Sequence, residues 1–137
     1  MEKMKIKILE IDKLHIHERT DSRNLDRIYA EVCSLQKVVP ILVDEKTMVV
    51  LDGHHRLKTL KMLGVNAIPA VLVDYFDEKI TVEPRRKNIP VSKELVLDAG
   101  MSGKPFPPKT SRHVTNTPIL AGFPLSRLYG DGFSNIE

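Results

Sequence analysis

The sequence contains one cysteine, no tryptophan and no long apolar run. Cys33 has no second cysteine with which to form an internal disulfide, so a reducing, cytoplasmic setting is expected. No apolar stretch approaches the ~20 residues of a membrane-spanning helix. Residues 1–7 are basic but carry neither an apolar signal core nor a small-residue cleavage site. These absences predict a cytoplasmic protein that does not associate with a membrane.

The sequence also lacks a strong charge of one sign. Its 137 residues include 21 Lys and Arg against 18 Asp and Glu, a net charge of +3. A chain of this length buries roughly two-thirds of its unfolded surface, and we expect a single domain over residues 1–137. The small net charge does not by itself indicate nucleic acid. It is equally compatible with a phosphate-bearing small molecule.

Alternation and helical periodicity predict a mixture of strands and helices. Strands are expected at 5–11, 41–43, 48–51, 68–75 and 79–82, with a hairpin around 44–47. Helices are expected at 23–36, capped by Ser22, between Gly53 and Gly64, and within 91–100, capped by Ser92. This order predicts an α+β fold, a small mixed β-sheet packed with helices, with a core over about 5–83.

The composition changes after residue 83. Residues 84–90 form a basic connector, and 103–113 contain three prolines and three cations. A segment of this composition is rigid and charged, so we expect a loop that serves as a binding element rather than a flexible linker. In the tail, Ile119, Leu120 and residues 125–129 are apolar and are expected to pack in part.

The sequence Asp52-Gly-His-His-Arg56 lies where a buried strand is expected to end and a helix to begin. Amides in a first helical turn lack intrahelical partners, so this terminus attracts phosphate. Gly53 would let a phosphate approach the backbone, and His54, His55 and Arg56 offer side-chain donors. Asp52 could bind Mg²⁺ or hold a reacting hydroxyl. The structural alternative is that Asp52 caps the helix and the histidines are solvated.

Residues 49–60, followed by Leu63-Gly64 and the strand at 68–73, resemble the signature of the ParB/sulfiredoxin superfamily. In that superfamily a Gly-x-x-Arg motif at a helix start holds nucleotide phosphates, and the match here is Gly53 to Arg56. The sequence is most similar to the ParB-like free L-serine kinases. These pair Asp-Gly-His-His-Arg with an upstream His-Glu and a downstream Phe-Pro-Pro-Lys-Thr-x-Arg-His. All three motifs occur here in order, at 17–18, 52–56 and 106–113.

The resemblance implies that a phosphoryl group passes from ADP or ATP, with Mg²⁺, to the hydroxyl of free serine. The product would be O-phosphoserine, and the resemblance also suggests a role in cysteine synthesis through this product. Glu18 matches the carboxylate that accepts the hydroxyl proton, and Asp52 matches a second acid beside the transferred phosphate and Mg²⁺. The phosphate-holding turn matches Gly53, His54, His55 and Arg56. A loop over substrate and phosphates matches Lys109, Thr110, Arg112 and His113, of which Arg112 or Lys109 could pair with the serine carboxylate. Ser22 is a further candidate for contact with the nucleotide or amino acid.

Two other functions are alternative interpretations of these residues. A ParB-like, DNA-associated regulator is suggested by the superfamily signature and by the basic run 85–87, and a nuclease is a third hypothesis.

Several features differ from the family or have a structural interpretation. The connection at 83–104 is shorter than in the serine kinases, so the chain is a compact version of them. Cys33 is expected to be a buried small side chain, and Tyr75 and Phe76 are expected to lie in the core rather than to stack on a ligand. The histidines lack zinc-like spacing.

Overall fold

The structure, a computed structural model, describes residues 6–115 and 121–129. Its elements in chain order are β1 Ile6–Glu10, η1 Ile11–Lys13, α1 Ser22–Leu35, β2 Lys37–Val38, β3 Ile41–Asp44, β4 Val50–Asp52, α2 His54–Met62, β5 Ala67–Val73, β6 Ile80–Pro84, α3 Lys93–Ser102, β7 Ser111–Thr115, β8 Phe123–Pro124 and η2 Leu125–Arg127. Within the described ranges, no helix is long and apolar enough to cross a membrane.

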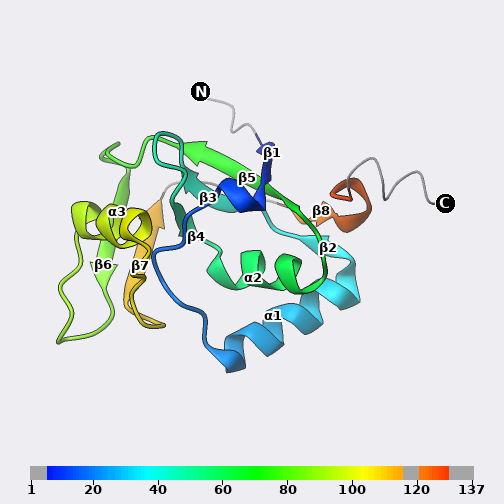
Figure 1. Cartoon of the computed structure of the whole chain (residues 1–137), viewed down its shortest axis with the longest axis horizontal. Coiled ribbons are helices and arrows are strands. Elements are labelled where there is room, and N and C mark those ends of the chain that lie inside the picture. The colour runs from blue at the N-terminus through cyan, green and yellow to red at the C-terminus, as the bar shows by residue number, and fades with distance from the viewer. Residues whose placement is uncertain (1–5, 116–120, 130–137) are drawn as a thin grey trace.

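Four strands form a mixed sheet in the order β1-β5-β3-β4. The β3–β5 pair is parallel, whereas β1–β5 and β3–β4 are antiparallel. The smaller pairs β2–β8 and β6–β7 are also antiparallel. Figure 1 shows α1 and α2 on one side of the four-stranded sheet, with α3 beside β6 and β7 at one end. The predicted α+β class, the small mixed sheet and the β3–β4 hairpin are confirmed.

The central strands are apolar on both faces because each face is covered. Side chains alternate along a strand, so Ile41 and Val43 join the cluster under α1 and α2, while Leu42 joins a second cluster with Val96 of α3. Covered faces explain why 41–43 is a continuous apolar run rather than an alternating one. The first cluster also contains Leu125 and Leu128, so the core includes tail residues beyond the limit expected near residue 83.

The caps of the helices correct one sequence prediction. Asp21, not Ser22, is the N-cap of α1, because its Oδ1 accepts a hydrogen bond from the Asn24 amide at 2.9 Å. Ser22 is instead the first residue of the helix. The cap of α3 by Ser92 is confirmed, with the Leu95 amide donating to its hydroxyl at 3.1 Å.

Three further expectations are wrong. Residues 111–113, expected in a loop, lie in β7 and pair with β6, so the side chains of Arg112 and His113 have fixed directions. Cys33 is partly exposed rather than buried. Tyr75 is buried as expected, but Phe76 is 53% exposed. The packing of 125–129 is confirmed at Leu125 and Leu128, whereas Ile119 and Leu120 lie outside the described residues.

Candidate active site

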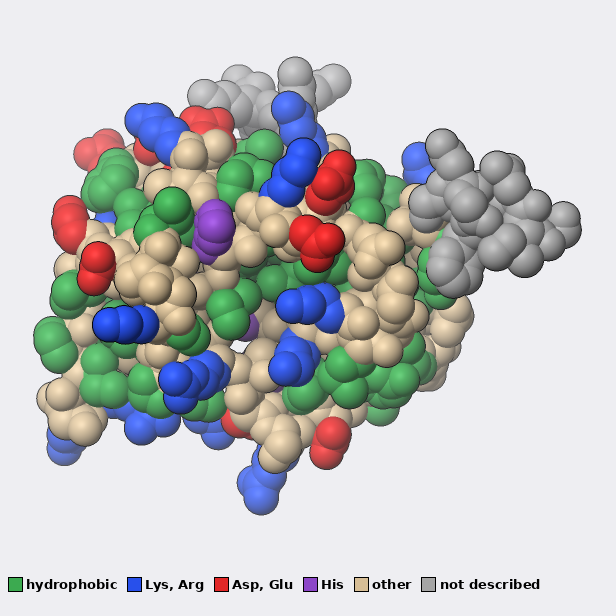
Figure 2. Space-filling view, in the orientation of Figure 1, with side chains coloured by type: hydrophobic (Ala, Val, Ile, Leu, Met, Phe, Trp, Pro, Cys, Tyr) green, Lys and Arg blue, Asp and Glu red, His purple; other side chains and the backbone are tan. Residues whose placement is uncertain are grey.

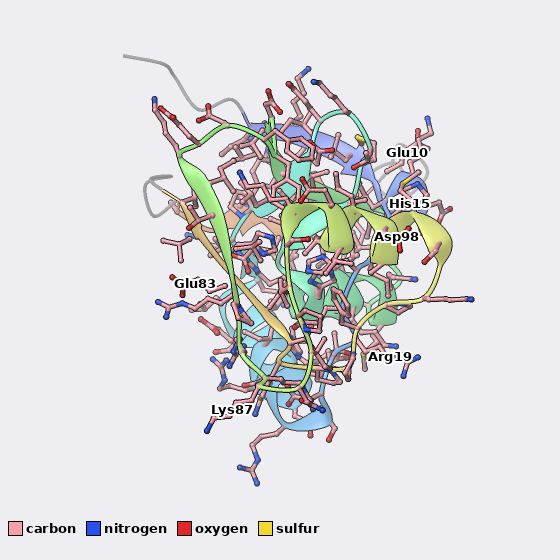
Figure 3. All side chains as sticks on the ribbon, turned by 90° about the vertical axis from the view of Figure 1, so that its left-hand side faces the viewer. Glu10, His15, Arg19, Glu83, Lys87 and Asp98 are labelled. Carbon is pink, nitrogen blue, oxygen red and sulfur yellow. The ribbon has the colours of Figure 1, made fainter. Side chains whose placement is uncertain are left out.

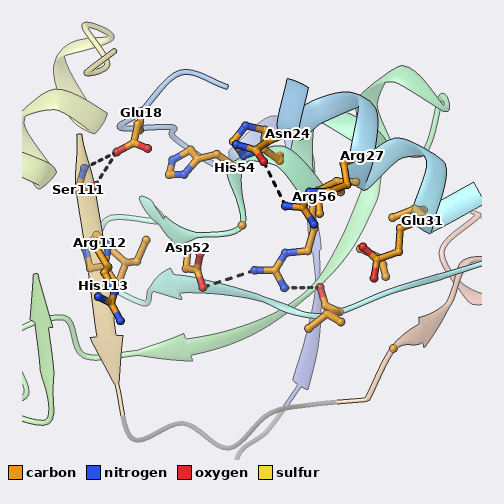
Figure 4. A pocket seen from close by; sticks show the side chains of 18 of the residues that line it. Glu18, Asn24, Arg27, Glu31, Asp52, His54, Arg56, Ser111, Arg112 and His113 are labelled. Carbon is orange, nitrogen blue, oxygen red and sulfur yellow. Dashed lines mark hydrogen bonds and ion pairs between the residues drawn. The ribbon is translucent and has the colours of Figure 1, made fainter. Parts of the chain in front are cut away.

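A cavity of about 690 Å³ opens between α1, the start of α2 and β7. Figure 4 shows Glu18, Ser111, Arg112 and His113 on one side of it and Asn24, Arg27, Arg56 and Glu31 on the other. The cavity is lined by His17, Glu18, Asn24, Arg27, Ile28, Glu31, Val32, Leu35, Lys37, Val38, Val39, Leu51, Asp52, Gly53, His54, His55, Arg56, Arg85, Ser111, Arg112, His113 and Gly122. Segments far apart in sequence therefore contribute to one concave surface.

Backbone hydrogen bonds hold the segment that carries Glu18. On one side, the His15 amide donates to Met48 and the Val50 amide donates to His15. On the other side, the Phe106 amide donates to His17 and the Arg19 amide donates to Phe106. The His-Glu motif is thus fixed between β4 and the proline-rich segment, although it belongs to no helix or regular strand.

The Glu18 carboxylate is held by donors from the third motif. The Ser111 amide and hydroxyl donate to Oε1 at 2.9 and 2.8 Å, and the Lys109 amide donates to Oε2 at 3.2 Å. Lys109 adopts a left-handed backbone conformation, with φ of 59°, that turns its amide toward this carboxylate. Glu18 is half-buried, so its carboxylate is oriented but remains at the cavity surface.

Gly53 precedes α2 in a conformation that favours glycine, with φ of 111°. A Cβ atom here would lie 2.3 Å from Cγ2 of Ile41, a residue that is 1% exposed. The first turn of α2 therefore packs tightly on β3. Its residues line the cavity, and the amides of a first helical turn have no intrahelical partners. This is the geometry expected for a phosphate-binding turn.

The two histidines of this turn organise the chain around it. Nε2 of His54 accepts a hydrogen bond from the His17 amide at 3.2 Å, and Nε2 of His55 accepts one from the Asp21 amide at 3.1 Å. The sequence predicted side-chain donors to phosphate, but these two nitrogens are acceptors, which leaves Nδ1 as the donor on each ring. Burial lowers the pKa of His54 well below its ordinary value, so this ring is neutral.

Arg56 joins the turn to the segment before β3. Its guanidinium donates to the carbonyls of Val39 and Pro40 at 3.2 and 3.0 Å. Its second terminal nitrogen lies 3.6 Å from the Asp52 carboxylate, whose side chain is 68% exposed. Arg56 lines the cavity and still has N–H groups for an anion, but part of its hydrogen-bonding capacity holds the fold.

A cluster of histidines lies behind Glu18. The rings of His54 and His113 are 4.5 and 5.4 Å from the ring of His17. Burial lowers the pKa of His17 and brings that of His113 to about 3. The Tyr75 hydroxyl lies within hydrogen-bonding distance of Nε2 of His113, at 2.8 Å, and burial raises the pKa of this phenol, so it keeps its proton. All three rings are therefore neutral near pH 7.

The structure brings most of the predicted site residues together. Glu18, Asp52, Gly53, His54, His55, Arg56, Arg112 and His113 line one cavity, whereas Ser22, Lys109 and Thr110 are not among its lining residues. Thr110 is fully buried and its hydroxyl donates to Pro107 at 2.7 Å, which fits a structural role in the turn. Lys109 contributes its backbone amide to Glu18 rather than a side-chain contact to the cavity.

Sequence reasoning missed the part of the wall that α1 supplies. Asn24, Arg27, Ile28, Glu31 and Leu35 line the cavity. Their spacings of three and four residues place them on one helix face. The sequence predicts this helix from its apolar positions and assigns no role to its polar residues. His17 and Ser111 were also missed, although both lie within the recognised motifs.

The basic run 85–87 is divided between different roles. Arg85 lines the cavity, and Arg86 donates to the Pro108 carbonyl, with its Nε at 3.1 Å. Lys87 is exposed in the segment after β6 (Figure 3). On the face shown in Figure 2, acidic and basic side chains are interspersed. In the described part of the chain, no group of three or more His, Cys, Asp or Glu side chains could hold a metal ion.

Comparison with curated proteins finds relatives of two descriptions. An ATP-dependent L-serine kinase from Staphylothermus marinus is 35% identical over 82 residues, which is 56% of this chain and 32% of the relative. An ADP-dependent L-serine kinase from Thermococcus kodakarensis is 30% identical over 82 residues, 54% and 33% of the two chains. A ParB-like protein from Sulfolobus acidocaldarius is 47% identical over 45 residues, 33% and 23% of the two chains. The matches thus span a third or less of each relative. No protein-family profile matches the chain.

Comparison with solved structures establishes the fold. A free serine kinase in complex with AMP has a TM-score of 0.81 at 18% identity, covering 93% of this chain and 95% of the other. A conserved hypothetical protein from Pyrococcus furiosus has a TM-score of 0.82 at 18% identity, covering 93% and 99%. The fold is therefore that of the free serine kinase. The resemblance predicted from the three motifs is confirmed by these structures and by the relatives named ParB-like and L-serine kinase.

Proposed function

We propose that the protein is a kinase that transfers a phosphoryl group from ATP or ADP to the hydroxyl of free L-serine, giving O-phospho-L-serine. The observation that carries the proposal is the position of Glu18. Its carboxylate is oriented by Ser111 and Lys109 at the wall of a cavity that also contains the Gly53–Arg56 turn. An oriented carboxylate in the same cavity as a helix-start turn with free amides suits phosphoryl transfer to a hydroxyl.

Each wall of the cavity has a part in this reaction. The free amides of α2 and the remaining donors of Arg56 bind the phosphates of the nucleotide. Glu18 accepts the proton of the serine hydroxyl, whose oxygen attacks the terminal phosphorus. The bond from that phosphorus to the nucleotide breaks, and the nucleotide leaves with the electron pair. Arg112, on β7, is available to pair with the serine carboxylate.

Asp52 fits the role of a magnesium ligand. Its carboxylate lies at the end of β4, it is largely exposed, and its contact with Arg56 is a 3.6 Å ion pair rather than a short hydrogen bond. Mg²⁺ is commonly held by one or two carboxylates together with substrate phosphates, so a set of three protein ligands is not required. The ion would neutralise charge on the phosphates.

The relatives support both nucleotides, because one is described as ATP-dependent and another as ADP-dependent. The test is to incubate the protein with Mg²⁺ and either nucleotide in the presence of L-serine, D-serine, L-threonine or L-homoserine. Mass spectrometry should detect O-phospho-L-serine with one donor preferred. The Glu18→Gln variant is the control. Nucleotide consumption without a phosphorylated amino acid would contradict the proposal.

The alternative function, a DNA-associated regulator, has less support. Two of the three cations in the run 85–87 are directed to the cavity wall or to Pro108, so the run is not a continuous surface for a phosphate backbone. Three expectations from the sequence stay predictions: a nuclease activity as an alternative, a cytoplasmic location and a role in cysteine synthesis.

A further inference from the structure

A chain of hydrogen bonds leads from Glu18 into the protein interior. Its first link joins Glu18 Oε1 to the Ser111 hydroxyl over 2.8 Å. The second joins the Ser111 hydroxyl to Nε2 of His17 over 3.0 Å, and the third joins Nδ1 of His17 to the Val50 carbonyl over 2.7 Å. Ser111 and His17 are 8% and 1% exposed, so water does not complete their hydrogen bonds freely.

The number of protons in this chain of hydrogen bonds follows from which of its groups can donate and which can only accept. The Val50 carbonyl can only accept, so Nδ1 of His17 carries a proton. The Ser111 hydroxyl has one proton, which it can donate to Glu18 or to Nε2 of His17 but not to both. With Glu18 ionised and His17 neutral, the three contacts share two protons. When the hydroxyl donates to Glu18, Nε2 of His17 has no donor within this hydrogen-bonded chain. When it donates to His17, Glu18 Oε1 keeps only the Ser111 amide as a donor from Ser111. Either way one of the two contacts of the hydroxyl lacks a proton, which is unfavourable in a buried place.

One additional proton satisfies every contact, in either of two arrangements. It can reside on the Glu18 carboxyl, which then donates to Ser111 while Ser111 donates to His17. It can also reside on Nε2 of His17, which then donates to Ser111 while Ser111 donates to Glu18. The chain is thus complete only after it has taken up one proton.

We propose that Ser111 and His17 are positioning residues that extend Glu18 into a three-residue proton acceptor. This inference rests on the proposed function, which supplies the proton. When the substrate O–H bond breaks, its proton enters the chain at Glu18, as the substrate oxygen bonds to phosphorus and the nucleotide leaves with the electrons of the broken P–O bond. The proton returns to solvent when the products leave.

The surroundings of His17 fit this role. Burial lowers the pKa of the ring, so it is neutral before the reaction and can receive a proton. The charges of Glu18 and Asp52 act in the opposite direction and favour a protonated ring. The rings of His54 and His113 also face His17 and are themselves neutral, since burial lowers the pKa of both.

Substitutions at position 111 separate the hydroxyl from the backbone amide. Ser111→Ala removes the hydroxyl but keeps the amide that donates to Glu18, and Ser111→Thr restores a hydroxyl. Ser102→Ala is the matched control, because its hydroxyl hydrogen-bonds with Ala99 and Lys104 of its own segment. We expect Ser111→Ala to lower the single-turnover rate of phosphoryl transfer by about 10- to 100-fold. The affinities for nucleotide and serine should stay within about three-fold, with recovery in Ser111→Thr.

A double-mutant cycle tests whether Ser111 acts through Glu18. Glu18→Asp keeps a carboxylate but withdraws it from Ser111, so a measurable rate should remain. In that background Ser111→Ala should cause little further loss. If Ser111→Ala is as active as Ser102→Ala, or costs the same factor in both backgrounds, the proton chain is refuted.

Nitrogen-15 NMR of the histidine rings tests the chain without any turnover. At neutral pH we expect His17 to be protonated on Nδ1 only, with an Nε2 resonance that moves in Ser111→Ala. A His17 ring protonated on both nitrogens would already hold the third proton and would overturn the inference. If the wild-type protein phosphorylates no amino acid, the proposed function fails, and the ring spectrum alone then supports or refutes the chain.

Discussion

Replacing Gly53 by alanine should be strongly destabilising, for two separable reasons. The backbone φ of 111° disfavours any residue with a Cβ atom, at about 1–2 kcal/mol. The new Cβ would also lie 2.3 and 2.8 Å from Cγ2 and Cβ of Ile41, which is buried and cannot move aside freely. Overpacking of this kind costs about 1–3 kcal/mol. We therefore expect the free energy of unfolding to fall by about 2–5 kcal/mol, a large part of the total for a small domain.

Gly64→Ala is the control that isolates the backbone contribution. Gly64 has φ of 76°, and nothing lies within 4 Å of a Cβ atom built there, so only the strain of about 1 kcal/mol should appear. Urea unfolding of the two variants measures the difference directly. Equal losses in Gly53→Ala and Gly64→Ala would show that α2 does not pack on Ile41 as described. The tight junction between Gly53 and Ile41 would then be wrong.

Three other predictions concern neighbouring parts of the site. Asp21→Ala should lower the free energy of unfolding by about 1 kcal/mol, because it removes the cap of α1, and a loss from Ser22→Ala of the same size would favour Ser22 as the cap. Arg56→Ala should weaken nucleotide binding by about 1–3 kcal/mol in isothermal titration, and unchanged affinity would place the phosphates elsewhere. In the unfolded chain His113 takes up a proton as the pH falls below its ordinary pKa of about 6.5, whereas in the folded protein it does so only near pH 3. Between these two pH values the unfolded state binds more protons, so the free energy of unfolding falls as the pH decreases. The expected loss from His113 between pH 7 and pH 5 is about 2 kcal/mol. The buried rings of His17 and His54 act in the same direction, so urea unfolding at both pH values should show a loss about 2 kcal/mol smaller in His113→Gln than in wild type.

The elements of the central fold could be predicted because each has a local signal. The apolar run at 41–43, the glycine at position 53 and the periodic leucines of α2 each indicate their structure without knowledge of the rest of the chain. The cap of α1 was missed because Asp21 and Ser22 are both good capping residues, and only the observed hydrogen bond to Asn24 distinguishes them. β7 was missed because its pairing with β6 joins segments about 30 residues apart.

The candidate site was predictable where a motif carried it and not where the fold assembles it. Glu18 and the turn at Gly53 stand in recognisable sequences, whereas the wall formed by α1 depends on how that helix packs against α2. Ser111 lies between two residues of the third motif, but its contact with Glu18 spans 93 positions of sequence. Nothing local to Ser111 indicates such a contact, since most serines of this kind lie in exposed loops.

The most direct test of the central claim is ³¹P NMR of the protein with Mg²⁺, L-serine and either ATP or ADP. We expect a phosphomonoester signal that requires serine, appears with a preferred donor and is absent from the Glu18→Gln variant. Nucleotide affinity of that variant should stay within a few-fold of wild type, because the substitution removes the base and leaves the turn at Gly53 intact. An equally strong serine-dependent signal from Glu18→Gln, or none from wild type with either nucleotide, would contradict the account.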